Sequence, residues 1–399
     1  MSTQPIRIGY GLSLTGPLAS NGNAARLAHQ IWARDVNKKG GLLGRKVELV
    51  CIDDETNPQL VPSIYQRLLD EEKVDLVVGG YGDNSVSPAM PLIVERNRYF
   101  VALMSLAVNA TFKYPNYFVM IPTGPRPAEA LTQGFFDVAA TQSPKPVTLA
   151  IVAADAPFSK APIEGAKAHA ERHGFKVVSE AKYPLSATDL TSYLSPLKST
   201  EPDILFFCSY LNDSVALLRA LDEVNLTPKV VGGAMIGPQN GGVKAQLGPL
   251  LNGVINYEYW IPVPKLMYPG VDEMISEYQS LVGESTADPL GYYVAPQAYA
   301  QMQVIEQAVA GTGSLDDAKL AEFTREATFK TVVGDVKFGS GGGWAEARVL
   351  TVQYQNIRTN DLADFKSPGT QAVVSPASLA SSPLIYPFAK ARKARSDAR

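Results

Sequence analysis

The sequence predicts an α/β fold built from parallel sheets with crossover helices. Short apolar runs rich in Val, Ile and Leu alternate with helix-length amphipathic segments. A strand–helix–strand–helix rhythm covers residues 6–80 and recurs over 148–208 without a residue-level repeat, which indicates two lobes of the same kind. A chain of 399 residues is long enough for two domains, each with its own core.

The elements follow in order along the first 232 residues. Strands are expected at 6–10, 46–53, 76–79, 99–103, 117–120, 148–153, 176–183, 204–208 and 229–232. Helices are expected at 22–37, 61–72, 87–96, 127–140, 159–173, 189–198 and 214–224. Within the second of these helices, Val61, Ile64 and Leu68 recur at helical spacing and should face a sheet.

The pattern is less regular after residue 232. Helices are expected at 296–310 and 316–327, followed by a glycine-rich turn at 339–343 and a strand at 347–353. We interpret these segments as returns to lobes that the chain has already begun.

Composition and charge exclude several classes of protein. With 36 Lys and Arg against 39 Asp and Glu, the net charge is -3, which lacks the excess of positive charge typical of nucleic-acid-binding proteins. The basic run at 390–399 is expected to be a frayed, solvated tail. No stretch of the sequence approaches the ~18 apolar residues of a spanning helix. The first residues lack the features of a secretory signal, so either a signal was removed or the protein is cytoplasmic.

Neither metal binding nor catalysis is expected from the residue pattern. Cys51 and Cys208 lie in separate apolar runs and are expected to be buried, unpaired thiols. Three histidines without a Cys/His cluster predict no metal site, and no cofactor is expected. The sequence contains no GxSxG motif, and the histidines, amid polar neighbours, are expected on the surface. The acidic run at 53–55 is interpreted as a solvated or hinge-side feature, so the protein is predicted not to be an enzyme.

Three loops at the carboxyl ends of predicted strands are candidate ligand-binding segments. The first, 9–22, is glycine-rich but lacks the GxGxxG spacing of a dinucleotide site. The others are 79–88 and 104–109, where Ser85, Ser105 and Asn109 could hold a carboxylate together with backbone N–H groups. Ser85 and Asn109 could equally cap helices or turns, and the two roles do not exclude each other.

Aromatic side chains gather at predicted loops and strand ends. Each belongs either to the core or to a pocket wall, and several on facing strand ends would form an apolar, stacking pocket. The residues concerned are Tyr81, Phe158, Tyr210, Tyr257, Tyr259, Trp260, Tyr292 and Tyr293.

The opening of the chain, from 6 to 58, resembles the leucine/isoleucine/valine-binding proteins of ABC importers. The resemblance rests on Thr15-Gly16-Pro17, Gly44-Arg45, Asp53-Asp54 and Asn57-Pro58, with Asn37 to Gly41 between them. It continues through 79–88, 104–109 and from 165 to about 338. It implies two Rossmann-like lobes of the periplasmic-binding-protein type I, joined by a three-crossover hinge, with the ligand in the interlobe cleft.

The resemblance also implies the bounds of the lobes. Crossovers are expected near 121–124, 256–259 and 336–338. The N-terminal lobe then comprises residues 1–122 and 258–336, and the C-terminal lobe comprises 123–257 and 337–399, so both are discontinuous. 

By position, the resemblance places ligand contacts on specific residues. In the first lobe, a loop flanking the ligand falls on Asn21, and the serine that grips the carboxylate falls on or beside Asp83, with Asn84 and Ser85 adjacent. The backbone segment that meets the carboxylate and amino group falls on 107–109. That segment comprises Ala107, Val108 and Asn109. In the second lobe, two ligand-contacting tyrosine positions of the family fall on Phe158 and Tyr210. The aromatic pattern described above adds Tyr81, Tyr259 and Tyr293 to the candidate ligand-binding residues.

One departure from the family pattern bears on the ligand. The family's acidic residue that pairs with the ligand's ammonium falls near Ala234 and Met235, where this sequence has no carboxylate. An unpaired buried ammonium costs several kcal/mol, so a small aromatic or apolar acid is expected instead of an α-amino acid. 

Two alternatives remain for the ligand and its setting. The chain is either a branched-chain or other amino-acid binding protein, or a cytoplasmic ligand sensor of the amide-sensing type. The resemblance implies a permease of the inner membrane as partner, a periplasmic location, and a monomer or weak dimer.

Overall fold

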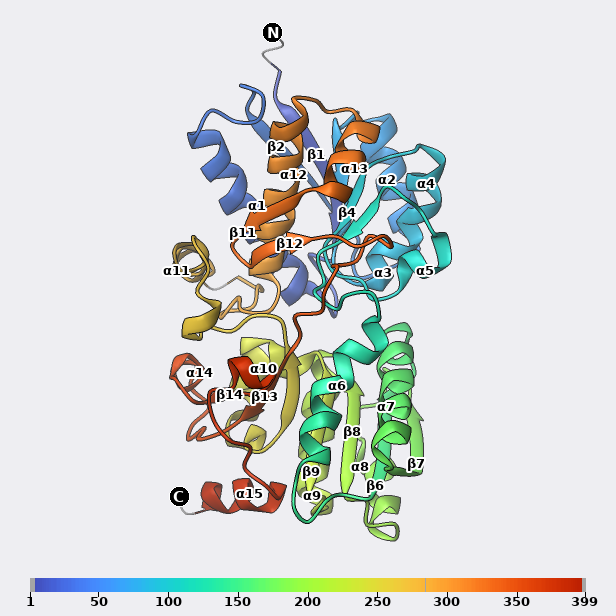
Figure 1. Ribbon diagram of the computed structural model, residues 1–399, viewed down its shortest axis with the longest axis vertical. Helices are drawn as coiled ribbons and strands as arrows, with labels where there is room; N and C mark the ends of the chain where they lie inside the picture. Colours follow the sequence, from blue (N-terminus) through green and yellow to red (C-terminus); the bar gives the residue numbers. More distant parts are fainter. Residues whose placement is uncertain (1–3, 284, 397–399) are drawn as a thin grey trace. The chain divides into compact units, whose positions relative to one another are not determined.

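The computed structural model describes residues 4–283 and 285–396 and divides into two compact units (Figure 1). Unit 1 consists of the chain up to Pro125 together with Pro264–Arg348, and unit 2 of Arg126–Val263 together with the chain from Val349 onward. Each unit is an α/β structure with a mainly parallel sheet, so the predicted fold class is confirmed.

Unit 1 contains, among the described residues, a five-stranded parallel sheet with the order β2-β1-β3-β4-β5. Its strands are β1 (Ile6–Leu12), β2 (Val47–Asp53), β3 (Leu76–Val78), β4 (Phe100–Ala102) and β5 (Tyr117–Val119). Its first helices are α1 (Ala19–Lys38), α2 (Val61–Asp70), α3 (Asp83–Val86), α4 (Met90–Glu95) and α5 (Val108–Phe112). The returning segment adds α11 (Val271–Leu281), α12 (Ala295–Thr312), α13 (Asp317–Glu326) and the hairpin β11 (Thr328–Thr331) with β12 (Gly334–Lys337).

The returning segment belongs to unit 1 because α12 packs against α1, beside which it lies in Figure 1. Helix α1 buries small residues such as Ala24, Ala25 and Ala28, which allow close approach of the neighbouring helix. Trp32 on the same helix is buried, and its indole N–H donates to Glu306 Oε2 of α12 at 2.9 Å. Apolar contacts and a partly buried hydrogen bond therefore hold together two segments that are far apart in the sequence.

Unit 2 contains, within the described part of the chain, a seven-stranded sheet with the order β14-β13-β10-β9-β8-β6-β7. Its strands are β6 (Thr148–Ala154), β7 (Lys176–Tyr183), β8 (Ile204–Ser209), β9 (Val230–Met235), β10 (Ile255–Glu258), β13 (Leu350–Tyr354) and β14 (Gln371–Ser375). Its helices are α6 (Pro127–Ala140), α7 (Lys160–His173), α8 (Thr191–Leu194), α9 (Leu211–Val224), α10 (Gly241–Leu247), α14 (Leu362–Lys366) and α15 (Phe388–Ser396). The strands β13 and β14 are antiparallel, and the others are parallel.

Strand β9 shows why two adjacent glycines stand in the middle of this sheet. Gly232 and Gly233 have φ values of 146° and 145°. A Cβ on Gly232 would lie 1.7 Å from the Ile255 carbonyl oxygen, and one on Gly233 would lie 2.2 Å from that of Phe207. The pairing of β9 with its neighbours β10 and β8 therefore requires glycine at both positions.

The chain passes between the units later than the expected crossovers. Residues 256–258 lie inside β10, where Asn256 pairs with Gly233 of β9 and Val352 of β13. Residues 336 and 337 lie in β12, which pairs with β11 of unit 1. The division therefore falls at Val263/Pro264 and Arg348/Val349. Strands β10 and β14 are short, and both are defined by their pairing with β13.

The basic C-terminal run is not a frayed tail as far as the structure describes it. Residues 390–396 lie in α15, where Ala391 and the first residue, Phe388, are buried. Arg392 forms an ion pair with Asp222 of α9. The prediction fails because Phe388 and Ala391, three residues apart on one face of the helix, pack beside Gly253. Residues 397–399 of the run lie outside the described residues. Both cysteines are free thiols, with Cys208 buried and Cys51 half-buried.

Candidate ligand-binding site

In each unit the parallel strands end at one edge of the sheet, and the candidate ligand-binding residues follow those ends. In unit 1 the loops after β1, β3 and β4 carry Ser13, Ser85 and Ser105. In unit 2 the loops after β6 and β8 carry Phe158 and Tyr210. The two edges are described separately.

Asp54 organises the edge of unit 1. Its side chain is buried, with 2% exposure, and its carboxylate accepts hydrogen bonds from Ser13 Oγ at 2.6 Å and Ser85 Oγ at 2.9 Å. The backbone N–H of Thr56 donates to the same carboxylate at 2.9 Å. The expectation of a solvated acidic run is therefore wrong for Asp54, because neighbouring strand ends supply enough donors to bury its charge. 

This network limits what Ser85 can offer a ligand. Its hydroxyl proton is directed at Asp54, so it cannot at the same time be donated to a ligand carboxylate. Sequence reasoning missed Asp54 as a partner of two serines. The available signal was its place after β2, the strand next to β1, with serines following the ends of β1 and β3.

Asp83 and Asn84 begin the short helix α3 in the loop after β3. Asp83 Oδ1 accepts a hydrogen bond from the Leu106 N–H at 2.9 Å, which ties this loop to the loop after β4. Burial raises the pKa of the Asp83 carboxyl above its ordinary value, and the bond from Leu106 opposes this only in part. The side chain of Asn84 is half-buried and has no hydrogen bond to another described residue.

The loop after β4 uses its polar side chains mainly within unit 1. Ser105 Oγ lies 2.5 Å from the hydroxyl of Tyr117. Asn109 Oδ1 accepts from the Tyr114 N–H at 2.8 Å, and its amide group donates to the carbonyls of Tyr114 and Gly341 at 3.1 and 3.0 Å. The side chain of Asn109 thus fastens the turn after α5. Of the remaining candidates in this loop, Ala107 is exposed and Val108 is buried.

Three further candidates of unit 1 are deeply placed. Asn21, in the first turn of α1, is 1% exposed, and among the described residues its amide nitrogen has no hydrogen-bond partner. Tyr81 and Tyr293 come together, with their hydroxyl oxygens 3.2 Å apart and their rings edge to face at a centroid distance of 6.1 Å. The structure therefore unites two aromatic candidates that are 212 residues apart in the sequence.

In unit 2, Phe158 and Tyr210 form the aromatic pair of the sheet edge. Their ring centroids are 5.8 Å apart in an edge-to-face arrangement, and both side chains are half-buried. The Tyr210 N–H donates to Asp213 Oδ1 at 2.9 Å, and Tyr183 OH donates to Asp213 Oδ2 at 2.7 Å. These two bonds fix the start of α9, on which the position of Tyr210 depends.

Ala234 and Met235 end strand β9 and are fully buried. The backbone of Met235 exchanges two hydrogen bonds with the Asn256 side chain, at 3.0 and 2.8 Å. Tyr259 follows β10, is 6% exposed, and its ring centroid lies 5.4 Å from that of Tyr257. These strand ends are therefore apolar and aromatic, with no carboxylate at 234 or 235.

A buried ion pair lies close to these strand ends and was not predicted. Lys244 Nζ on α10 is 3.6 Å from Glu258 Oε1 on β10, and both side chains are fully buried. The ammonium also lies 5.9 Å from the centre of the Tyr354 ring, whose hydroxyl is 3.4 Å from Glu258 Oε1. A lysine on a short helix and a glutamate in a strand carry no pairing signal in the sequence, since the contact depends on the tertiary fold.

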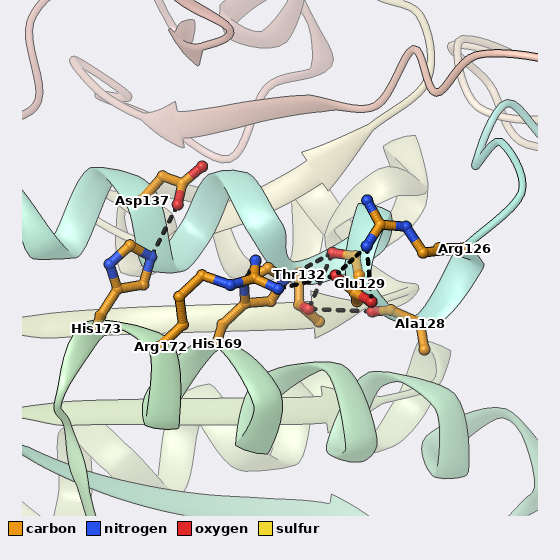
Figure 2. Close-up of polar contacts among 8 residues, drawn as sticks. All are labelled: Arg126, Ala128, Glu129, Thr132, Asp137, His169, Arg172 and His173. Atoms are coloured by element: carbon orange, nitrogen blue, oxygen red, sulfur yellow. Dashed lines mark hydrogen bonds and ion pairs between the residues drawn. The ribbon is translucent and has the colours of Figure 1, made fainter.

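Two of the three histidines are not on the surface as expected, and the third, His173, is half-buried. His29 and His169 are both fully buried. Burial lowers the pKa of His29 to about 3, while its Nε2 lies 2.9 Å from Gln301 Oε1. Figure 2 shows His169 between α6 and α7, where Nε2 donates to the Glu129 carbonyl at 3.0 Å and Nδ1 accepts from Arg172 at 3.1 Å. Both rings serve packing, because polar neighbours in sequence do not report which side of a helix faces the core.

The described residues contain neither a metal-binding cluster nor a membrane-spanning helix. Within residues 4–283 and 285–396, no three His, Cys, Asp or Glu side chains are grouped so that they could hold a metal ion. In the same part of the chain, no helix combines the length and apolar character needed to cross a membrane.

Comparison with known proteins supports one family. Residues 5–359 match the family model described as periplasmic binding protein. The chain is 24% identical over 350 residues to the leucine-, isoleucine-, valine-, threonine- and alanine-binding protein of Pseudomonas aeruginosa, covering 86% of this chain and 88% of that protein. It is 25% identical over 348 residues to the Leu/Ile/Val-binding protein BraC3 of Rhizobium johnstonii, covering 84% and 88%.

Solved structures share the fold. The branched-chain amino acid substrate-binding protein LivJ of Streptococcus pneumoniae, in complex with isoleucine, superposes with a TM-score of 0.77 at 16% identity, covering 94% of this chain and 100% of that one. A solute-binding protein of Rhodopseudomonas palustris in complex with benzoate gives a TM-score of 0.76 at 16% identity, covering 95% and 98%.

Proposed function

The chain belongs to the periplasmic binding protein family, and on this basis we propose that it captures a small organic acid with an aromatic or apolar body. It is a solute-binding protein of an ABC transporter and not an enzyme. We further propose a periplasmic location, delivery of the ligand to an inner-membrane permease, and capture by hinge closure, in which binding energy selects the closed state.

The observation that carries the proposal is the charge balance at the ends of β9 and β10. Ala234 and Met235 offer no carboxylate to a ligand ammonium. The nearby carboxylate of Glu258 is fully buried and already has the Lys244 ammonium as its counter-ion. A ligand ammonium placed there would be desolvated without a free counter-charge, at a cost of several kcal/mol.

The aromatic side chains of unit 2 favour an aromatic body. Phe158 and Tyr210 are half-buried, so part of each ring is available for contact, and edge-to-face pairs hold ring positions well. The Rhodopseudomonas palustris protein with benzoate bound shows that this fold accommodates such an acid. An apolar pocket with few polar groups would derive its affinity from buried ring area.

An α-amino acid is the second candidate, and Asp83 is the observation that favours it. The Asp83 side chain is half-buried and accepts a hydrogen bond from the Leu106 N–H. Burial raises the pKa of the Asp83 carboxyl because it destabilises the charged form. A ligand ammonium beside the carboxylate would stabilise that charged form. The relatives from Pseudomonas and Rhizobium are named for amino acids, leucine, isoleucine and valine among them.

The deciding experiment is a thermal-shift and calorimetry panel with benzoate, 3,4-dihydroxybenzoate, cinnamate, leucine, isoleucine and acetamide. At a hundredfold excess over the dissociation constant, a true ligand should stabilise the protein by about 2.7 kcal/mol. Stabilisation by an aromatic acid, weakened by Tyr210→Leu and retained by Asp83→Asn, supports the proposal. Stabilisation by leucine that Asp83→Asn abolishes contradicts it and establishes the amino-acid alternative.

The panel also tests the amide-sensing alternative. A response to acetamide alone would favour a sensor. Expression of the complete gene in a Gram-negative host, followed by osmotic shock, tests the location, because a periplasmic protein is released and a cytoplasmic one is retained.

A further inference from the structure

Unit 2 has a hollow on the β7 side of β6, separate from the aromatic pair. Its volume is about 210 Å³, and it is lined by the loop after β6, the start of α7 and the end of β7. Strand β6 lies between β8 and β7 in the sheet. Phe158 pairs with Tyr210, which follows β8, whereas Lys182 of β7 and Ile163 of α7 line the hollow.

The rim of the hollow carries an excess of positive charge. Lys160 and Lys182 both line it, and among the described residues neither ammonium forms an ion pair or hydrogen bond. Glu180, the acidic residue of β7, is 2.5 Å from Lys167 and is therefore engaged elsewhere. Asp155 is the acidic residue in the lining, so the rim retains one net positive charge.

The start of α7 adds to this field. The helix is 14 residues long and has no acidic residue in its first turn, while its first residue is Lys160. A helix N-terminus carries partial positive charge, so a lysine there is unfavourable unless an anion is close. Lys160, Lys182 and the start of α7 thus line one hollow, and Asp155 is the acidic residue in that lining.

Ser159 provides a buried donor in the same lining. Its side chain is 2% exposed, and its oxygen has no hydrogen-bond partner of ordinary geometry among the described residues. The neighbouring Cys208 thiol is a weak donor that keeps its proton, because burial raises its pKa to about 12. Ser159 interacts with the Cys208 sulfur, which is only a weak acceptor, so an oxyanion in the hollow would compete for the Ser159 hydroxyl proton.

The hollow is held in shape by the contact of α7 with α6. A Cβ on Gly165 would lie 2.0 Å from the Ala128 carbonyl oxygen, so the two helices touch at their backbones. Farther along, Arg172 pairs with Glu129 at 3.0 Å and His173 with Asp137 at 2.9 Å, as Figure 2 shows. These contacts fix α7 independently of any ligand.

We propose that this hollow binds a small oxyanion, the carboxylate of a short organic acid or a phosphate, through Lys160, Lys182 and the Ser159 hydroxyl. Its volume is below the ~300–1,000 Å³ of sites for drug-sized ligands, which fits a small anion. The site is separate from the one under the proposed function and does not depend on it.

The test is titration of the full chain with inorganic phosphate, acetate and benzoate at constant ionic strength, followed by amide NMR signals of Ser159, Lys160 and Ile163. The variants are Lys160→Gln, Lys182→Gln, their combination and Ser159→Ala. Lys176→Gln is the matched control, because Lys176 is an exposed lysine at the opposite end of β7. We expect saturable shifts, with affinity about two- to fivefold weaker for each lysine variant and unchanged for the control.

The response to the different anions identifies the source of the oxyanion. A stronger response to phosphate assigns a phosphate site, and an equal response to acetate and benzoate assigns a carboxylate site. Absence of saturable shifts, or equal affinities in the double variant and Lys176→Gln, overturns the proposal. Tyr210→Leu should leave these shifts intact, so failure of the aromatic-acid proposal is recognised separately.

Discussion

The two units share one order of parallel strands, β2-β1-β3-β4-β5 in unit 1 and β7-β6-β8-β9-β10 in unit 2, but their sheet edges carry different side chains. In unit 1, charged and hydroxyl groups gather around Asp54, which is buried but receives three hydrogen bonds. In unit 2, the corresponding strand ends carry Phe158, Tyr210, Ala234 and Met235, and the local charge of Glu258 is matched by Lys244. The edge of unit 1 is thus dominated by polar contacts within the unit, whereas that of unit 2 is mainly apolar and aromatic.

The largest effect is expected from breaking the charge balance of unit 2. Lys244→Met leaves Glu258 buried without its counter-ion, which should lower the free energy of unfolding by about 3–5 kcal/mol. Adding Glu258→Gln should recover a large part of the loss, because the uncompensated charge disappears. Urea unfolding measures both.

The control for this prediction is an ion pair near the surface of the same unit. Lys229 is 2.9 Å from Asp203, and its side chain is one-third exposed. Lys229→Met should therefore cost at most about 1 kcal/mol. If Lys244→Met and Lys229→Met lower the free energy of unfolding equally, Lys244 does not stabilise the buried charge of Glu258. The charge balance proposed for the edge of unit 2 would then be wrong.

The next effect concerns the polar edge of unit 1. Asp54→Asn removes a charged acceptor from Ser13, Ser85 and the Thr56 N–H, at an expected cost of about 1.5–3 kcal/mol in the free energy of unfolding. The exposed neighbour Glu55 serves as control, since Glu55→Gln should change stability by less than about 0.5 kcal/mol. If Asp54→Asn leaves the free energy of unfolding unchanged, the hydrogen-bond network does not require the negative charge of Asp54.

The two units also show which strands and which roles of loop residues can be predicted from the sequence. Apolar strands such as β1, β6 and β8 could be predicted because their pattern is local, and α6 begins and ends where its periodicity does. Strand β10 could not, since its four residues are defined by pairing with β9 and β13. The family resemblance located the loops, but hydrogen bonds between loops decide the roles of Ser85 and Asn109.

Charged residues were the least predictable part of the site. Asp54, Glu258 and His169 were each expected at the surface or not considered, and each is buried. Their burial depends on partners far away in the sequence, such as Ser85 for Asp54 and Lys244 for Glu258. A polar residue type therefore predicts exposure only where no such partner exists in the fold.

The interior of unit 1 predicts a pH dependence of stability. His29 has a folded-state pKa of about 3, against about 6.5 in an unfolded chain. Between these values the unfolded chain binds a proton that the folded chain does not, so stability is present above pH 6.5 and is lost as pH falls. The slope should be about 1.4 kcal/mol per pH unit.

His29→Gln isolates this contribution. The variant removes the titrating group while Gln301 can still accept a hydrogen bond from an amide. Urea unfolding at pH 6.5, 5.5 and 4.5 should show a slope that is shallower in the variant by about 1.4 kcal/mol per pH unit. Parallel slopes in the two proteins would contradict a neutral, buried His29. Carboxyl groups titrate equally in both and cancel in the difference.

The smallest effect addresses the aromatic side of the comparison. Tyr210→Leu keeps apolar volume but removes the edge-to-face partner of Phe158, so the affinity for an aromatic acid should fall by about 0.5–1.5 kcal/mol, roughly two- to tenfold. Tyr193→Leu is the control, because Tyr193 forms a similar pair with Tyr183, at 5.9 Å, but lies on α8 outside the loops after β6 and β8. Calorimetry with benzoate separates the two variants. If both bind benzoate as the unmodified chain does, ring contact in unit 2 does not contribute affinity, and the polar edge of unit 1 would have to supply it alone.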